Sequence, residues 1–507
     1  MDIKLLLIFL VAGFFSCTDK ASVQEKPNVV IIYLDDLGYG DLGCYGTSKI
    51  ATPNVDHLAE NGIRFTNAYS SAATCTPSRY SLLTGEYAFR IKAGIQDGNA
   101  PLLIKEGTPT LPGMLQANGY KTALIGKWHL GLGDGNLDWN GKIAPGPLER
   151  GFDYAWMIPA TGDRVPTVWV ENHHVARLDT EDPIEVSYKE KVGNDPTGLE
   201  NPELLRIPAD RQHAKTIVNG VSRIGWMSGG NAARWNDEQI PHLMLKKARE
   251  FINDHKEEPF FIYFSMHDVH DPRLPDYRFQ GQSGLGNYGD VVVQMDWVTG
   301  QLVDYLKKLG LSKNTLIIFS SDNGPALNDG YEDHRSIAHP DSGNHRSSGP
   351  LRGGKYSAFE AGSRMPTIAY WPAVIEPGVS DALISQVDLY ASIAAMLGHT
   401  LRPGEAPDSE DISDALLGRS HSGREYLVTE SFTYSVRKGN FKYIHPVKNV
   451  QSSGWIGGTK KIESGASLSP QLYDLSVDIG EQSNIAAGNE PVVEEMKAYL
   501  EGVLRED

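Results

Sequence analysis

A cysteine lies where the sequence predicts the start of a helix. Cys75 opens the stretch Cys-Thr-Pro-Ser-Arg-Tyr-Ser-Leu-Leu-Thr-Gly, in which Thr76 fits an N-cap, Pro77 the first helical position and Gly85 the residue after the end. A helix N-terminus presents unpaired N–H groups and partial positive charge, so it favours a thiolate or a bound anion. Arg79 adds a fixed positive charge one turn further on. For a cysteine considered alone, a buried structural role is the better interpretation.

Polar side chains follow four apolar runs that have the composition of buried parallel strands. The runs span 28–34, 121–125, 259–264 and 315–320. In chain order they lead into Asp35-Asp36, Gly126-Lys127-Trp128-His129, His267-Asp268-Val269-His270 and Asp322-Asn323-Gly324-Pro325. Loops are polar in any protein, which accounts for one such cluster but poorly for four. Because ligands bind at the carboxyl ends of strands in open α/β sheets, the sequence predicts a functional site at this edge.

Oxygen donors dominate two of these clusters. Asp35, Asp36, Asp322 and Asn323 offer carboxylate and amide oxygens, which Ca²⁺ and Mg²⁺ prefer, whereas zinc more often takes His and Cys ligands. Helix caps and turns are the alternative, and for Asp35-Asp36 alone the two interpretations are about equally supported. The second pair at another strand end favours one metal site formed from both.

Other cationic and imidazole side chains are candidates for handling charge or protons. Lys127 and His129 stand two residues apart after a strand, although such a pair is often part of a solvated loop. His267 and His270 lie in Met-His-Asp-Val-His-Asp-Pro, where metal binding is an alternative. Lys355 follows Leu-Arg-Gly-Gly. These spacings alone leave the roles open.

The complete set of motifs resembles that of the type I, formylglycine-dependent sulfatases of the alkaline phosphatase superfamily. The signature is Cys-x-Pro-Ser-Arg followed by Leu-Thr-Gly, and His-x-x-His-x-Pro is a second family pattern. Phe359–Pro366 resembles the family's Glu-Gly-Gly-x-Arg-x-Pro, with Ala361 in place of the first glycine. Gln471–Leu475 and Glu481–Asn484 resemble its C-terminal Leu-Tyr-Asp-Leu…Glu…Asn pattern. The resemblance covers nearly the whole mature chain from Asn28 onward.

The resemblance implies a covalent catalyst that uses one divalent cation. In this family a formylglycine-generating enzyme oxidises the signature cysteine, here Cys75, to an aldehyde whose hydrate attacks sulfur. The positions that match the family's metal ligands are Asp35, Asp36, residue 75, Asp322 and Asn323, and the ion is usually Ca²⁺, with Mg²⁺ less favoured. The implied fold is α/β, an alkaline-phosphatase-like mixed sheet flanked by helices with a smaller C-terminal α+β domain.

The resemblance also assigns catalytic roles. Arg79, Lys127 and Lys355 would stabilise the sulfate, and Lys127 would also contact the formylglycine. His129 would take a proton from the hydrate when sulfate is expelled, and His270 would bind sulfate and protonate the leaving oxygen. His267 is expected to be structural or near the pocket wall.

The net charge of the chain restricts its partners. A value of −17 argues against nucleic acid and also opposes the approach of a sulfated substrate, so the site must be locally positive. Arg79, Lys127, Lys355 and the cation would supply that charge, because salt screens distant surface charges beyond ~8–10 Å.

The N-terminus predicts export. Residues 1–16 combine Lys4 with an apolar run over 5–15, as in a signal peptide, and the following Cys17 completes a sequence that resembles a lipoprotein cleavage site. A plain secretory signal is the alternative. We expect a protein of the periplasm or the outer membrane and cell surface, touching the membrane only through a lipid on Cys17. If Cys17 is lipidated and Cys75 oxidised, Cys44 has no disulfide partner.

The chain length of 507 residues suggests a large domain and a smaller one. We expect a tether over 17–26, a catalytic domain over 27–401 and a C-terminal subdomain over 402–507 that combines a small antiparallel sheet with a helix. Helices are predicted near 55–61, 110–118, 241–255, 294–309, 386–397 and 491–504. The Gly-, Pro- and charge-rich region 139–227 is predicted to be a long insertion that shapes the substrate pocket.

We therefore expect a sulfatase that hydrolyses the sulfate esters of a carbohydrate or polysaccharide. A phosphatase or phosphodiesterase of the same superfold is the alternative, but such enzymes normally carry an unmodified Ser or Thr nucleophile. A non-catalytic binding protein is disfavoured by the complete set of catalytic positions.

Overall fold

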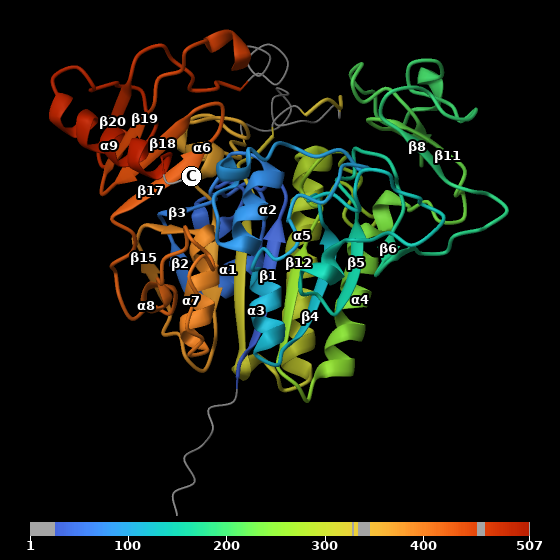
Figure 1. Cartoon of the computed structure of the whole chain (residues 1–507), viewed down its shortest axis with the longest axis horizontal. Coiled ribbons are helices and arrows are strands. Elements are labelled where there is room, and N and C mark those ends of the chain that lie inside the picture. The colour runs from blue at the N-terminus through green and yellow to red at the C-terminus, as the bar shows by residue number, and fades with distance from the viewer. Residues whose placement is uncertain (1–25, 327–328, 333–344, 454–461, 506–507) are drawn as a thin grey trace, which may run out of the picture.

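The computed structural model describes residues 26–326, 329–332, 345–453 and 462–505 (Figure 1). The predicted signal peptide, Cys17 and nearly all of the tether lie outside the described residues. No helix in the described ranges is long and apolar enough to cross a membrane.

A ten-stranded mixed sheet forms the centre of the large domain, in the order β15-β2-β14-β13-β1-β12-β4-β5-β6-β7. Five neighbouring strands are parallel: β13 (Thr315–Ser321), β1 (Asn28–Leu34), β12 (Phe260–Ser265), β4 (Lys121–Lys127) and β5 (Tyr154–Ile158). The first four are the strands predicted from the apolar runs, and they are adjacent. Their carboxyl ends therefore meet at one edge. The flanking strands are β15 (Gly378–Ser380), β2 (Ile63–Phe65), β14 (Thr367–Tyr370), β6 (Val170–Glu171) and β7 (His174–Val175).

Helices cover both faces of this sheet because successive side chains of its buried strands point to opposite sides. Val29 and Ile31 pack in one cluster with α2 (Cys75–Thr84), α3 (Leu111–Ala117), α7 (Leu389–Met396) and α8 (Ser413–Leu416). Val30 and Ile32 pack in the other with α1 (Pro53–Glu60), α4 (Ile240–His255) and α5 (Gly286–Lys308). The result is a three-layer α/β/α domain, as expected.

A smaller sheet packs beside the large domain near the C-terminus (Figure 1). Its antiparallel strands are β17 (Tyr426–Glu430), β18 (Tyr434–Lys438), β19 (Phe441–Ile444) and β20 (Gln471–Asp474), and α9 (Glu490–Val503) covers it. The expected fold class, a mixed α/β domain with a small C-terminal domain, is confirmed. The boundary between 401 and 402 stays a prediction.

Short elements complete the chain. In the described part of 176–235 these are β8 (Glu185–Ser187), β9 (Ile217–Val218), β10 (Val221–Ser222) and β11 (Trp226–Ser228). In Figure 1 the segment with β8 and β11 lies on the side opposite the C-terminal sheet. The pair β3 (Ala68–Tyr69) and β16 (Ile384–Ser385) and the single turn α6 (Glu360–Ser363) lie elsewhere in the large domain.

Two predicted elements are wrong in part. The region 139–227 is not wholly an insertion, because β5 belongs to the central sheet and pairs with β4. Its five residues are too few to stand out among glycines and prolines. The helix predicted to begin at 294 begins eight residues earlier, at Gly286. Its first turns bury polar side chains such as Asp290, so the apolar periodicity that marks the rest of the helix is missing there.

Candidate active site

Helix α2 places Cys75 at the carboxyl edge of the sheet. Thr74, in an extended conformation, precedes the first helical residue, Cys75, so the N-cap predicted at Thr76 is wrong by two residues. The prediction placed Pro77 at the first helical position, but proline is tolerated throughout the first turn. The helix ends as predicted at Gly85, whose φ of 68° is left-handed.

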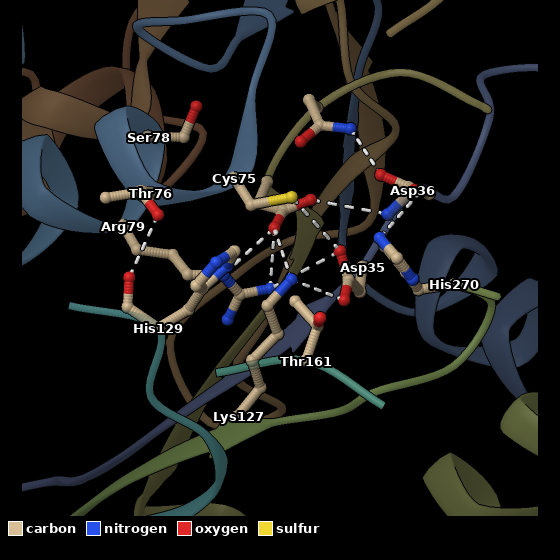
Figure 2. A network of polar contacts seen from close by, with 12 residues as sticks. Asp35, Asp36, Cys75, Thr76, Ser78, Arg79, Lys127, His129, Thr161 and His270 are labelled. Atoms are coloured by element: carbon tan, nitrogen blue, oxygen red, sulfur yellow. Dashed lines mark hydrogen bonds and ion pairs between the residues drawn. The ribbon is translucent and has the colours of Figure 1, made fainter. Parts of the chain in front are cut away.

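Cys75 is buried and lies against a carboxylate. Its side chain sits at the centre of the network in Figure 2, with Sγ 3.6 Å from Asp35 Oδ1. Burial and the nearby Asp322 raise the pKa of the thiol well above its usual value, although Lys127 and Lys355 oppose this. An unmodified Cys75 would therefore remain a thiol, and a thiol is a poor nucleophile.

Two buried cationic side chains, Arg79 and Lys127, lie among the carboxylates beside Cys75. Arg79 donates to Asp322 Oδ2 from Nε at 2.9 Å and from Nη2 at 2.6 Å. Lys127 Nζ donates to Asp35 Oδ2 at 2.6 Å and lies 3.9 Å from Asp322 Oδ2. Neither side chain lines the open pocket described below. Their positive charges are therefore paired with the carboxylates of Asp35 and Asp322.

A second cluster surrounds Lys355, which lines the pocket. Lys355 Nζ donates to Asp36 Oδ2 at 2.9 Å and to Asp329 Oδ2 at 3.0 Å, and it lies 3.0 Å from His270 Nε2. His270 Nδ1 donates to Asp271 O at 2.6 Å, which leaves Nε2 as the acceptor facing Lys355. Burial and Lys355 lower the pKa of His270 well below its usual value.

These residues fit a divalent cation. Ligand atoms of Asp35, Asp36, Cys75 and His270 lie within 4.8 Å of one another. Asn323 donates through Nδ2 to Asp36 Oδ1 at 2.6 Å, while its buried Oδ1 has no hydrogen-bond partner among the described residues. Burial raises the pKa of Asp35 to about 6 and of Asp36 to about 7, although neighbouring lysines oppose the shift. A bound cation would stabilise both carboxylates in the charged form.

The balance of charge also favours a cation. Four carboxylates (Asp35, Asp36, Asp322 and Asp329) face three cationic side chains (Arg79, Lys127 and Lys355). When all are ionised the cluster carries one net negative charge, which repels an anionic ester. A divalent cation would reverse that sign. The local positive charge expected from the sequence therefore depends on the ion.

Asp322 lies next to the possible ligand atoms and accepts from two donors. Arg79 Nη2 donates to Asp322 Oδ2 at 2.6 Å, and the Asp36 N–H donates to Asp322 Oδ1 at 3.3 Å. His270, which the resemblance expects to bind sulfate and protonate the leaving oxygen, also offers a ring nitrogen to the group of possible ligand atoms formed by Asp35, Asp36 and Cys75.

His129 also reaches the pocket. Its Nε2 lies 2.9 Å from Gln96 O, and its Nδ1 is buried without a partner in the described part of the chain. Its φ of 56° and the φ of 60° at Asp36 are uncommon for residues other than glycine, and such conformations cluster at functional sites. Burial and Lys127 lower the pKa of His129 well below its ordinary value. His267 is buried but does not line the pocket.

A pocket of about 270 Å³ opens above Cys75. His129, His270 and Lys355 line its inner part together with Cys75. Its other walls contain side chains that sequence reasoning missed: Ile95, Asp97, Asp163, Arg164, Gln212, His213, Ile224, Asp329 and Tyr356. The pocket therefore combines the predicted reactive groups with a polar wall suited to a hydroxyl-rich molecule.

Asp163 and Arg164, which the sequence analysis missed, also follow the carboxyl end of a strand in the central sheet. Asp163 and Arg164 come shortly after β5, and Thr161 of the same loop lies beside the network in Figure 2. Treating 154–158 as a fifth apolar run would have found them. Asp329 had no such signal, because it lies well beyond the end of β13.

Comparisons with known proteins agree with this arrangement. A family model described as Sulfatase matches residues 27–399. The chain belongs to the sulfatase family.

Individual relatives cover almost the whole chain. This sulfatase is 48% identical to an N-acetylgalactosamine-6-O-sulfatase of Bacteroides thetaiotaomicron over 489 residues, which cover 96% of this chain and 94% of the relative. It is 32% identical to human arylsulfatase A over 498 residues, 95% and 86% of the two chains. A solved structure from work on the metabolism of multiple glycosaminoglycans by B. thetaiotaomicron superposes with a TM-score of 0.91 at 48% identity, covering 94% of this chain and 99% of that one.

Family membership settles the class of reaction. The protein is a sulfuric ester hydrolase that acts on sulfated carbohydrate esters, as expected from the sequence, and its family depends on a metal and on formylglycine. The phosphatase alternative has no support from these matches.

Proposed function

We propose that this enzyme removes a 6-O-sulfate from an N-acetylgalactosamine residue at the end of a glycan. The observation that carries the proposal is the 48% identity to an N-acetylgalactosamine-6-O-sulfatase across 96% of the chain. The size of the pocket supports action on one sugar. About 270 Å³ lies near the lower limit of ~300–1,000 Å³ for small-molecule sites, so it fits one sulfated sugar better than a length of polymer.

The polar wall supports recognition of the sugar hydroxyls. Arg164 Nη1 donates to Asp163 Oδ2 at 2.8 Å, and His213 Nε2 lies 3.5 Å from the same oxygen. The Asp163 side chain is 4% exposed and the Arg164 side chain 13%. Two charged partners that hold each other in place present donors and acceptors at low cost in entropy, and sites of this kind discriminate strongly between hydroxyl arrangements.

We propose that residue 75 works as formylglycine. Cys75 Cβ would become the aldehyde carbon, so Sγ marks the approximate place of a hydrate oxygen. The hydrate supplies an oxygen nucleophile that a buried thiol cannot. Asp35, Asp36, Asp322, Asn323 and residue 75 would hold a divalent cation, and Asp322 would also bind Arg79. The ion is proposed to be Ca²⁺, which accepts the irregular oxygen ligand sets found in proteins more readily than Mg²⁺.

The remaining side chains would bind the ester and move protons. Lys355 lines the inner part of the pocket beside Cys75, so it would bind a sulfate oxygen. Lys127 would hold Asp35 charged and orient residue 75. His270 Nε2 would deliver a proton to the leaving oxygen, and His129 Nδ1 would accept a proton from residue 75 when sulfate leaves.

A panel of sulfated sugars tests the substrate. We expect desulfation of N-acetylgalactosamine-6-sulfate, with free sulfate measured and the position of the remaining groups determined by NMR. Because Asp163 and Arg164 hold fixed orientations, the gluco epimer should be a poorer substrate. Equal rates on both epimers, or a preference for 4-O-sulfate, would refute the proposal.

We further propose that the protein is exported and anchored by a lipid on Cys17. The support is the sequence of residues 1–17 alone. The native protein should fractionate with membranes, and Cys17→Ala should release it. A soluble wild-type protein with a cleaved signal would support plain secretion instead.

A further inference from the structure

The segment that carries Lys355 is held in an unusual conformation. Gly353 and Tyr356 have φ values of 84° and 72°, and the second is rare for a large aromatic residue. A backbone in this region persists only where its surroundings determine it strongly. The large domain supplies two such contacts, from the Lys355 N–H to Pro325 O at 3.0 Å and from the Tyr356 N–H to Ala73 O at 2.8 Å.

The C-terminal domain contacts the same segment on both sides of Lys355. Before it, Arg352 Nη1 donates to Glu481 O at 2.5 Å. After it, the Glu360 N–H donates to Glu481 Oε2 at 2.6 Å. Between these points Ser357 Oγ donates to Glu463 O at 2.6 Å. Glu481 therefore binds both ends of the segment 352–360.

The Glu481 carboxylate is itself fixed by a buried cation. Lys442 Nζ of β19 lies 3.1 Å from Glu481 Oε1 and 3.0 Å from Glu360 Oε1. The side chains of Lys442, Glu481 and Glu360 are at most 1% exposed. Loss of the Glu481 carboxylate would leave the Glu360 N–H without an acceptor and Lys442 with one carboxylate fewer. Both defects are costly in a buried site, so the segment would shift to relieve them.

We propose that Glu481 is a positioning residue for Lys355, so that the C-terminal domain contributes to the sulfate site without touching it. The inference rests on the proposed function of Lys355 as a sulfate-binding group. It also gives a physical reason for the Glu481–Asn484 pattern, which the catalytic chemistry does not use.

A double-mutant cycle with Lys355 tests this role. The metal-loaded enzyme, produced with its maturation enzyme, is assayed on para-nitrophenyl sulfate. We expect Lys355→Ala to lower kcat/KM by about 10²–10³-fold, as for other groups that stabilise developing charge. Glu481→Ala should lower it by about 10–100-fold, since a displacement of about 1 Å has effects of that size. In the Lys355→Ala background, Glu481→Ala should cost no more than about 2-fold.

The controls separate positioning from loss of stability. Glu481→Gln keeps an oxygen for the Glu360 N–H, so it should retain more activity than Glu481→Ala, and it replaces that variant in the cycle if Glu481→Ala does not fold. Glu405→Ala removes an equally buried carboxylate that binds Tyr390 and Arg402, away from this segment. It should lower the melting temperature without an effect that depends on Lys355.

The activities of these variants decide whether Glu481 positions Lys355. Wild-type activity in folded Glu481→Ala would overturn the inference. So would a loss in Glu481→Ala, or in Glu481→Gln where it replaces that variant, that multiplies with the loss in Lys355→Ala. Full activity of Lys355→Ala would instead overturn the proposed role of Lys355, and the inference with it.

Discussion

Replacing His270 with alanine should separate two kinds of leaving group. Nδ1 of His270 is committed to Asp271 O at 2.6 Å, so Nε2 is the atom that can deliver a proton into the pocket. Burial and Lys355, whose Nζ is 3.0 Å from Nε2, lower the pKa of His270, so the imidazolium there is a strong acid. The negative charge of a bound sulfate ester would favour its formation. A sugar alkoxide needs that proton, whereas nitrophenolate leaves without it.

The expected loss of activity in His270→Ala follows from the role of His270 as a general acid. General acid catalysis contributes about 10²–10⁴-fold, which corresponds to about 3–5 kcal/mol of barrier. We expect His270→Ala to lose this factor in kcat/KM on N-acetylgalactosamine-6-sulfate. On para-nitrophenyl sulfate the loss should be smaller by at least about tenfold, because only the binding contribution of His270 is removed.

His267→Ala is the matched control. The two imidazole rings are 5.8 Å apart, but His267 does not line the pocket. Its variant should show no dependence on the leaving group. Equal losses of His270→Ala on both substrates would mean that His270 only binds sulfate. A leaving-group dependence in His267→Ala would mean that His267, and not His270, donates the proton.

Three further predictions address the ion, the polar wall and pH. Chelation should lower both activity and melting temperature, with Ca²⁺ restoring them better than Mg²⁺; unchanged values after complete removal of metal would contradict the proposed site. Arg164→Met should raise KM for the sulfated sugar by about 10-fold or more and leave para-nitrophenyl sulfate nearly unaffected, and equal effects on both would exclude a role in sugar recognition. Burial disfavours the His213 imidazolium, but Asp163 and Asp210 outweigh it and raise the pKa. The stability that this interaction supplies is complete below the ordinary pKa of about 6.5 and lost as pH rises through the raised value, so His213→Gln should destabilise the protein more at about pH 5.5 than at about pH 9 in denaturant titrations.

Local sequence patterns predicted the part of the site that adjacent strands build. A continuous apolar run marks a buried parallel strand, and the residue after it must lie at the carboxyl edge of the sheet. This pattern predicts that Asp35, Lys127, His270 and Asp322 lie together at one edge of the sheet. It failed at β5, whose five residues lie in a glycine- and proline-rich region.

Other parts of the site depend on contacts that no local pattern contains. Asp329 reaches Lys355 from a loop beyond β13, and Glu481 reaches the same segment from a different domain. Arg79 and Lys127 are expected to stabilise the sulfate, and the structure pairs Arg79 with Asp322 and Lys127 with Asp35. Composition indicates that such charges are present, whereas their partners are set by tertiary packing.

The chemical state of residue 75 tests the central claim most directly. The account requires formylglycine, because burial keeps an unmodified Cys75 protonated and leaves it a poor nucleophile. Mass spectrometry of the peptide that contains Thr74–Arg79 in the active enzyme should show the aldehyde or its hydrate, and activity should rise in proportion to the converted fraction. A fully active preparation whose residue 75 is entirely an unmodified thiol would contradict the account.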